Sequence, residues 1–255
     1  NIIYKTKKFY NHIKRLILDF FAKFIFQGGI IMFYEPSKND HGLSRNPFKS
    51  CTVPRVIGWI STKNEDGTDN IAPYSQFTNL TFDPPLVLFS SNQNVIGDRK
   101  TTVKNIERTG QFVYNMVSYD LREAMNRSSI FKVPNGYKDK FEYSGLTKAK
   151  SNLIDVARVA ESPIQYECKY IQTIRIPAND TLATVDVIIG QVIGIHIADE
   201  YILPDGKIDI CRIQPVARLG YFDFTVVNNS FEMAPPKVDD PENQRLVDKG
   251  LEGKV

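Results

Sequence analysis

The stretch TVPRVIGWISTKNEDGTDNIAP, residues 52–73, carries the clearest indication of the fold. Residues 52–62 are rich in β-branched side chains, which favour strands. The NEDG sequence at residues 64–67 is a strong hairpin turn signal. Residues 70–73 then resume a strand-like pattern. The stretch therefore predicts two antiparallel strands joined by a tight turn.

Outward from this hairpin, the chain continues as short apolar or alternating runs separated by turn residues, a pattern typical of strands. Apolar residues recur at helical spacing in only a few segments, one of which ends at Gly110. Many short strands with few helices indicate an antiparallel barrel or sandwich in a single domain, not a doubly wound sheet. The further predicted strands are residues 86–90, 111–117, 164–176, 184–197, 208–213 and 220–227, and the predicted helices are 101–109, 119–127 and, more weakly, 152–160.

Composition narrows the class of protein. Apolar residues make up 42% and charged residues 24% of the chain, as in ordinary globular proteins. A net charge of +3, with no basic stripe carrying aromatic residues, argues against a nucleic-acid partner. No apolar run is long enough to span a bilayer, so we expect no membrane partner. The three cysteines include no C-x-x-C pair, which argues against a disulfide framework or zinc site and favours a reduced, cytoplasmic setting.

The two ends differ from the middle. Residues 1–31 are rich in Ile, Phe, Lys and Asn and precede Met32, and we interpret them as a non-native or mistranslated extension. An amphipathic helix is the alternative, and the intact mass of the native protein decides between them. We place the folded domain at residues 32–236 and a Pro-, Asp- and Lys-rich tail, expected to be an arm or disordered, at 237–255.

Several catalytic classes are excluded by what the sequence lacks. The histidines are His12, His41 and His196, too few and too scattered for a Ser-His-Asp triad or a multi-histidine metal site. His196 is expected to be a packed or rim residue. Neither a phosphate-binding P-loop nor a Rossmann glycine motif is present. We therefore predict no metal and no catalytic side chain, with any difficult chemistry carried by a cofactor.

The first candidate site lies between residues 90 and 105. A strand ends in short polar side chains, and after a loop two cations and two threonines open a helix. Free backbone N–H groups, hydroxyls and cations at a helix start form an anion site suited to a phosphate monoester. The alternative is that Thr101 or Thr102 merely caps the helix. The candidate residues are Ser90, Ser91, Asn92, Arg99, Lys100, Thr101 and Thr102.

The second candidate is APYSQF at residues 72–77, directly after a strand. Unpaired N–H groups of irregular backbone could bind a flat polar ring there. On its own, the pattern of Tyr74, Ser75, Gln76 and Phe77 is better explained as a turn with both aromatic rings packed inward. Phe131 and Tyr137, in the loop-like residues 128–145, could cover a bound ring, although core positions are favoured for them.

Taken in order, these segments resemble the flavin reductase-like, FMN-binding split-barrel family, in particular its branch of nitrilotriacetate monooxygenase component B and flavoredoxin-type proteins. The resemblance covers about residues 32–236 and rests on a collinear series of segments. They are HGLSRNPFKS (41–50), PRVIGWIST (54–62), residues 66–91 and 99–117, SPIQYECK (162–169) and PVARLGYFDF (215–224).

The resemblance implies an antiparallel, Greek-key split β-barrel and a homodimer that binds FMN non-covalently near the subunit interface. Tyr74, Ser75 and Gln76 would hold the flavin ring, and the residues of the first candidate site would hold the phosphate. Pro54 and Arg55 would pass beside the ring, and Arg218 and Tyr221 would reach it from the C-terminal strands. This chain has Lys100-Thr101-Thr102 where the family usually has Lys-Asp-Thr.

The implied activity is flavin reduction, a hydride transfer from NADH or NADPH to FMN that needs stacking at close range rather than a protein base. Reduced flavin could then supply a partner flavin-dependent monooxygenase. Two alternatives remain open: an FMN-binding electron carrier of flavoredoxin type without nicotinamide turnover, and a non-catalytic flavin-binding or interaction protein.

Overall fold

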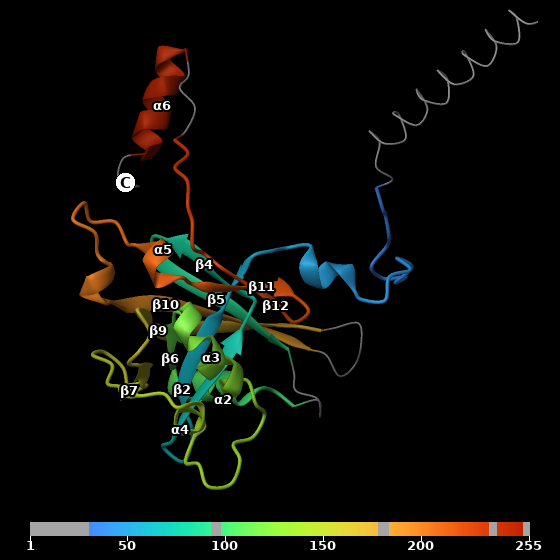
Figure 1. The fold of residues 1–255 in the computed structure, drawn as a ribbon, viewed down its shortest axis with the longest axis vertical. Helices are drawn as coiled ribbons and strands as arrows, with labels where there is room; N and C mark the ends of the chain where they lie inside the picture. The colour runs from blue at the N-terminus through green and yellow to red at the C-terminus, as the bar shows by residue number, and fades with distance from the viewer. Residues whose placement is uncertain (1–30, 93–97, 178–183, 235–238, 252–255) are drawn as a thin grey trace, which may run out of the picture. The chain divides into compact units, whose positions relative to one another are not determined.

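The computed structural model describes residues 31–92, 98–177, 184–234 and 239–251, so residues 1–30 of the predicted extension lie outside it (Figure 1). Strands dominate the described part of the chain. They are β1 (Arg55–Val56), β2 (Gly58–Lys63), β3 (Asp69–Tyr74), β4 (Phe77–Phe82), β5 (Pro85–Asn92), β6 (Gln111–Asn115), β7 (Lys148–Ala149), β8 (Arg158–Val159), β9 (Ile164–Ile176), β10 (Val185–Ile197), β11 (Val216–Gly220) and β12 (Asp223–Val226).

Helices fill the connections. The α-helices are α2 (Thr101–Thr109), α3 (Arg122–Ser128), α4 (Lys140–Ser144), α5 (Ile210–Ile213) and α6 (Pro241–Leu251), and the short 3-10 helices are η1 (Pro47–Ser50), η2 (Tyr119–Leu121) and η3 (Asp199–Tyr201). Among the described residues, no helix is long and apolar enough to cross a membrane.

The main sheet has the strand order β3-β2-β6-β9-β10-β5-β4, and every pairing in it is antiparallel. Its two outermost strands, β3 and β4, follow each other in the chain and are separated only by Ser75 and Gln76. The sheet must therefore curl until its two edges meet, which produces a barrel. Strands β1, β11 and β12 form a second, smaller sheet, and β7 pairs with β8. The prediction of a mainly β, antiparallel fold is confirmed.

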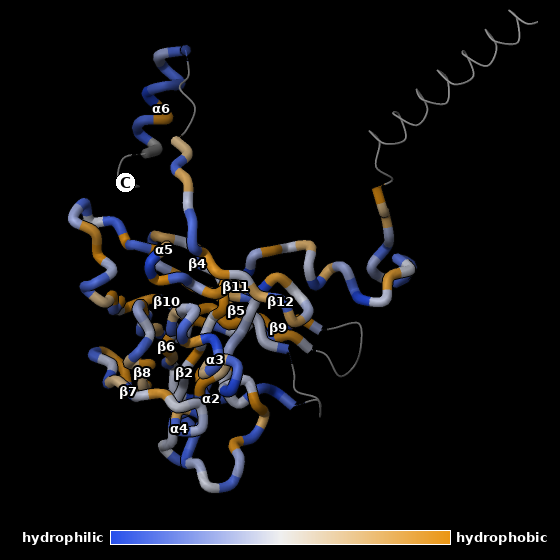
Figure 2. The backbone as a smooth tube through the Cα atoms, viewed as in Figure 1, coloured by the Kyte–Doolittle hydropathy of each residue, from blue (hydrophilic) through white to orange (hydrophobic). Residues whose placement is uncertain are grey.

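Two apolar clusters hold this arrangement together. One fills the barrel and includes Phe77, Phe89 and Phe112, while the other lies between the sheet and helices α3 and α4 and includes Trp59 and Phe141. Strand β2 is buried along nearly its whole length because it contributes to both clusters, which explains its continuous apolar run. In Figure 2 the strands carry most of the hydrophobic colour, whereas α6 is largely hydrophilic.

Several local predictions are confirmed. Helix α2 and strand β9 have the predicted bounds, and the hairpin of β2 and β3 turns at the predicted residues. Gly190 lies where β10 crosses the Phe112 ring, because a Cβ at this position would lie 2.4 Å from that ring. The glycine thus marks a close packing contact inside the barrel.

Other local predictions are wrong. Residues 152–160 are not helical, because N–H groups that a helix would pair internally donate elsewhere. That of Val159 donates to Asn115 Oδ1 at 2.8 Å, and that of Ala160 donates to the Thr147 carbonyl at 2.9 Å. Residues 210–213 form helix α5 and not a strand, since the Asp209 side chain accepts from the N–H of Arg212 at 3.1 Å and starts the helix. Strand β4 was not predicted at all.

Residues 220–227 form a turn and a strand rather than one continuous strand. Gly220 has φ +105°, and a Cβ there would lie 2.5 Å from the carbonyl oxygen of Lys49, so the turn between β11 and β12 requires glycine. In the tail, which we expect to be an arm or disordered, the structure has helix α6, with Asp240 accepting from the N–H of Asn243 at 3.2 Å near the helix start.

The described residues before Lys49, residues 31–48, belong to a unit separate from the rest of the chain. In its described part, the rings of Tyr34 and His41 meet edge to face with centroids 5.2 Å apart. The candidate site residues all belong to the second unit, which begins at Lys49.

Candidate functional site

A cavity of about 130 Å³ opens at the start of helix α2. Strand β3 forms one wall, the first turn of α2 forms another, and the segment after α3 together with the start of α4 completes it. Four predicted site residues thereby meet at one place. The lining residues are Asn70, Ala72, Pro73, Tyr74, Lys100, Thr101, Thr102, Ser129, Ile130, Phe131 and Lys140.

The first turn of α2 is suited to an anion. Lys100 is the N-cap residue, with extended backbone and no side-chain capping bond, and the first turn contains no acidic residue. The predicted alternative, a threonine cap, is therefore wrong. Uncapped N–H groups at a helix start carry partial positive charge and bind anions readily.

Lys140 was not predicted and adds a second cation to the cavity. Burial, with a contribution from the charge of Lys100, lowers the pKa of the Lys140 ammonium to about 8. None of the residues that line the cavity is acidic. Two ammonium groups thus share a cavity without a compensating carboxylate in its lining. Lys140 is 38 residues away from Thr102 in the chain, and no local pattern in the sequence marks it.

Behind the cavity lies a buried hydrogen-bond network. Asn70 Nδ2 donates to Thr102 Oγ1 at 3.0 Å, so the Thr102 hydroxyl braces β3 against α2. Burial raises the pKa of Tyr74 to about 12 against the opposing effect of hydrogen bonds with Thr102 and Ser91, so its phenol stays protonated at neutral pH. Tyr74, Ser91 and Thr102 are therefore positioned together, as a rigid wall behind the helix start.

Arg99 takes a different position from the predicted one. Its Nε donates to Asp186 Oδ2 at 2.9 Å, and its two terminal nitrogens donate to the Glu107 carboxylate at 2.6 Å each. These contacts raise the pKa of the Arg99 guanidinium above its ordinary value, with the Glu107 bond the largest cause. Because two carboxylates occupy the guanidinium, the interpretation of Arg99 as a phosphate ligand needs correction. The residue ties α2 to β10.

The predicted ring site lies at the turn between β3 and β4. Ser75 and Gln76 form this turn, and the Gln76 carbonyl accepts from the N–H of Ser90 at 3.0 Å. The Phe77 ring is buried and stacks on Tyr114 with centroids 4.4 Å apart, so its side chain belongs to the barrel core as the packing alternative stated. Asn92 is exposed at the end of β5, and residues 93–97 lie outside the described part.

Phe131 and Tyr137 are not core residues. Phe131 is 65% exposed and lines the α2 cavity, and Tyr137 is 48% exposed. The interpretation that favoured core positions is therefore wrong, and Phe131 is placed where it can contact a ligand.

Four predicted ring contacts do not line the α2 cavity but lie around the small sheet of β1, β11 and β12. They are Pro54, Arg55, Arg218 and Tyr221. Arg55 and Arg218 face each other in the β1–β11 register. Pro54 precedes β1 and follows a cis peptide bond, and Tyr221 occupies the β11–β12 turn with φ +46°. Arg218 lines a second cavity of about 370 Å³, between η2–α3 and β11–β12, which shares no lining residue with the α2 cavity.

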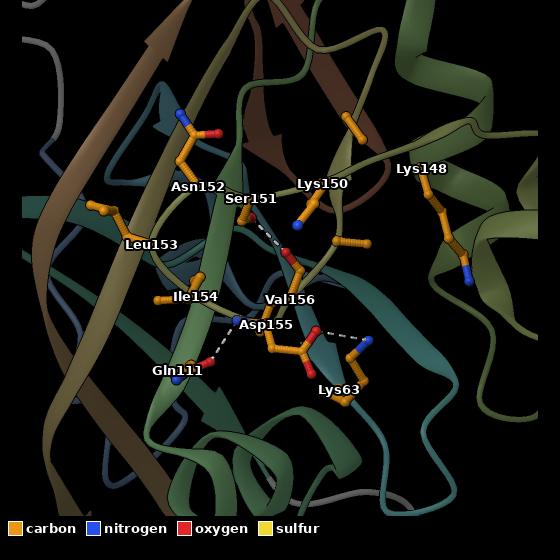
Figure 3. Close-up of a pocket in the computed structure, with 12 residues that line it drawn as sticks. Lys63, Gln111, Lys148, Lys150, Ser151, Asn152, Leu153, Ile154, Asp155 and Val156 are labelled. Carbon is orange, nitrogen blue, oxygen red and sulfur yellow. Dashed lines mark hydrogen bonds and ion pairs between the residues drawn. The ribbon is translucent and has the colours of Figure 1, made fainter.

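A third cavity, of about 540 Å³, is lined by three lysines and the 149–157 segment (Figure 3). Lys63 pairs with Asp155 at 3.6 Å, and the backbone N–H of Asp155 donates to Gln111 at 3.0 Å, as Figure 3 shows. Lys148 pairs with Asp69 at 2.8 Å and Asp139 at 2.5 Å. The cavity is the largest of the three, but two of its three lysines are paired with carboxylates, so it is a weaker anion site than the α2 cavity.

His196 is a packed residue, as predicted. Its Nε2 lies 2.6 Å from the buried Glu167 carboxylate, which also accepts the N–H groups of Asn152 and Leu153. Although burial opposes it, these hydrogen bonds hold the pKa of Glu167 below its ordinary value. Among the described residues, no group of three His, Cys, Asp or Glu side chains is arranged to hold a metal ion.

Comparison with known proteins places the chain in a family. Residues 50–209 match the flavin reductase like domain. The chain belongs to the flavin reductase-like family. A protein of Halalkalibacterium halodurans is 34% identical over 188 residues, which cover 74% of this chain and 88% of that protein.

Solved structures agree with the fold. Nitrilotriacetate monooxygenase component B from Bacillus cereus superimposes with a TM-score of 0.72 at 25% identity, covering 81% of this chain and all of that one. A putative flavin reductase with a split barrel domain from Shewanella frigidimarina superimposes with a TM-score of 0.66 at 21% identity, covering 81% and 100% of the two chains. The predicted resemblance and the split-barrel fold are both confirmed.

Proposed function

We propose that this chain binds FMN non-covalently, with the phosphate in the α2 cavity, and reduces it with NADH or NADPH. The observation that carries the proposal is the pair Lys100 and Lys140 at an uncapped helix start. Two ammonium groups without an acidic neighbour in the lining suit a phosphate dianion. The donors present therefore fit the phosphate of FMN.

Each wall of the cavity has a distinct role in this proposal. Lys100, Lys140 and the N–H groups of Thr101 and Thr102 would hold the phosphate, while Asn70 and Tyr74 keep Thr102 in place. When bound, FMN would supply the hydride-accepting flavin ring. Ser75 and Gln76 would lie beside that ring, because the β3–β4 turn follows directly on Tyr74 in the cavity wall. We propose no FMN contact for the remaining candidates, namely Arg55, Arg99, Arg218, Tyr221 and the Phe77 side chain.

The size of the cavity supports a homodimer. A volume of about 130 Å³ holds a phosphate but is smaller than the roughly 300–1,000 Å³ of sites that enclose a whole ligand. The flavin ring would therefore extend over the surface, where a second subunit can cover it.

An exposed apolar patch offers the dimer contact. Ile174 and Ile176 on β9 are 46% and 48% exposed, and they pair across the sheet with Val187 and Val185 on β10. These four apolar side chains lie on one face of the sheet, and we propose that a second subunit covers them. Sedimentation should show a dimer for the parent chain and a monomer with weaker FMN binding for Ile174→Asp. A parent chain that is monomeric and binds FMN no more tightly than Ile174→Asp would refute the proposed dimer.

The FMN site is tested by titration. We expect Lys100→Ala to weaken FMN binding by roughly 1–3 kcal/mol, because a charge-assisted bond is lost. Lys104→Ala is the matched control, since Lys104 lies on the same helix and pairs with Asp98 at 2.5 Å. Equal affinity in the two variants would remove the phosphate assignment.

Turnover is tested by anaerobic mixing of the FMN-loaded protein with NADH and with NADPH. Rapid loss of the visible absorption band of oxidised flavin supports a reductase. A flavin band that persists with both nicotinamides identifies an electron carrier instead. Because the chain is similar to nitrilotriacetate monooxygenase component B, we also propose that reduced flavin passes to a separate monooxygenase.

A further inference from the structure

The cavity between η2–α3 and β11–β12 is chemically unlike the other two. Its lining combines aromatic rings with guanidinium groups, and its volume is about 370 Å³. The α2 cavity holds ammonium groups, and the cavity of Figure 3 has no aromatic lining residue. A different class of ligand is therefore expected here.

Two arginines face each other beside this cavity. Arg55 and Arg218 are directly opposed in the antiparallel β1–β11 pair, so their side chains lie on the same face of the sheet. Like charges in this position are destabilising. No carboxylate forms an ion pair with either guanidinium among the described residues, and the Arg55 Nε is buried without a hydrogen-bond partner there. Of the two, Arg218 lines the cavity, so an anion bound to Arg218 there would offset this repulsion.

The surrounding charge is positive overall. Glu123 lies 3.8 Å from Arg122, and Asp223 attracts Arg218, so two carboxylates face three guanidinium groups. Burial, reinforced by the charge of Arg55, lowers the pKa of Arg218. The arginine side chain nevertheless stays charged at any physiological pH.

Aromatic rings line the cavity beside the guanidinium groups. The Arg218 guanidinium lies 4.5 Å from the centre of the Phe224 ring, and that of Arg122 lies 3.9 Å from the centre of the Tyr119 ring. Phe222 is 85% exposed at the same cavity. Stacked guanidinium groups keep their outer edges free for a planar, bidentate partner.

The two walls of the cavity are tied together by the backbone. The N–H of Tyr119 donates to the carbonyl of Gln214 at 2.9 Å, and the N–H of Val216 donates to that of Val117 at 2.9 Å. These bonds fix η2 against the start of β11. The site is thus formed before any ligand arrives, which reduces the ordering cost of binding.

We propose that this cavity is a second small-molecule site, which binds a planar aromatic carboxylate. The carboxylate would pair with Arg218, which lines the cavity and is opposed by Arg55 across the β1–β11 pair, and the ring would pack among Phe224, Phe222 and Tyr119. The site does not depend on flavin, so its test is independent of the function proposed above.

The experiment uses the full chain without FMN and calorimetric titration with benzoate. Three related probes accompany it: benzamide lacks the charge, cyclohexanecarboxylate lacks the flat ring, and adenosine monophosphate replaces the carboxylate by a phosphate. We expect benzoate to bind at least about tenfold more tightly than each of the three, since a charge-assisted bidentate pair and stacking are both required.

Variants locate the binding. Arg218→Gln and Phe224→Leu should each weaken benzoate binding about tenfold or more. Arg212→Gln is the matched control, because Arg212 also stacks on an aromatic ring, that of Tyr201 at 5.4 Å, but lines none of the three cavities. If Arg218→Gln fails to fold, Phe224→Leu still tests the site.

Four results would overturn the proposal. They are equal affinity for benzamide, tighter binding of adenosine monophosphate, an equal loss in Arg212→Gln, and stoichiometric displacement of benzoate by FMN, which would make the cavity part of the flavin site. Failure of FMN to bind at the α2 cavity leaves the benzoate titration unchanged, so the two proposals fail separately.

Discussion

The charge of Lys140 destabilises the ligand-free fold but is expected to strengthen FMN binding. The variant Lys140→Met allows each effect to be measured. In the ligand-free protein the pKa of this lysine falls from its ordinary value of 10.5 to about 8. One pH unit corresponds to about 1.4 kcal/mol, so the charged form destabilises the fold by up to roughly 3 kcal/mol. Its side chain is partly exposed, so we expect a gain of about 1–3 kcal/mol in unfolding free energy for Lys140→Met at pH 7.

The pH dependence identifies the cause. Below pH 8 both folded and unfolded chains hold the proton, and the full destabilisation is present. Between pH 8 and 10.5 the unfolded chain holds more protons than the folded one, so the stability contributed by this site rises with pH. The advantage of Lys140→Met over the parent should therefore shrink between pH 7 and pH 10. The packing of the methionine side chain also changes the unfolding free energy, but by an amount that does not depend on pH.

Urea unfolding of both proteins at the two pH values measures this difference, and FMN titration at pH 7 measures binding. The variant should be more stable yet bind FMN about 1–3 kcal/mol more weakly, because a charge-assisted contact is lost. Lys104→Met is the control, since Lys104 is exposed and should show no such gain. A stability difference that is equal at pH 7 and pH 10, or unchanged FMN affinity, would refute the reasoning.

Three further outcomes follow from the structure. FMN affinity of the parent should fall above about pH 8, by up to roughly tenfold per pH unit as Lys140 loses its proton, and a pH series of titrations should show no such fall in Lys140→Met. Arg99→Met should lower the unfolding free energy by about 3 kcal/mol because it leaves the buried Asp186 carboxylate without its closest cation, while FMN affinity, measured on the folded fraction, changes little. Gly190→Ala should destabilise by roughly 1–3 kcal/mol in urea unfolding, since its Cβ would meet the Phe112 ring at 2.4 Å, whereas Gly67→Ala meets no neighbouring atom and tests only the strain of positive φ.

The local signals in the sequence were sufficient for most of the barrel. Helix α2 and strand β9 follow from residue spacing and from the glycine that ends the helix, and the β2–β3 hairpin follows from its turn residues. Local spacing predicted the wrong element where backbone N–H groups form hydrogen bonds with residues far away in the chain. Residues 152–160 have weak helical spacing, but Asn115 and Thr147 accept the N–H groups of Val159 and Ala160, which a helix would have used.

The residues that could form an anion site were evident from the sequence, because Lys100, Thr101 and Thr102 are neighbours at a helix start. Which cations remain available there depends on the folded chain. It paired Arg99 with Asp186, 87 residues away, and brought Lys140 into the cavity instead. The physical reason is that turns and helix caps depend on adjacent residues, whereas charge pairing depends on distances that exist only after the chain has folded.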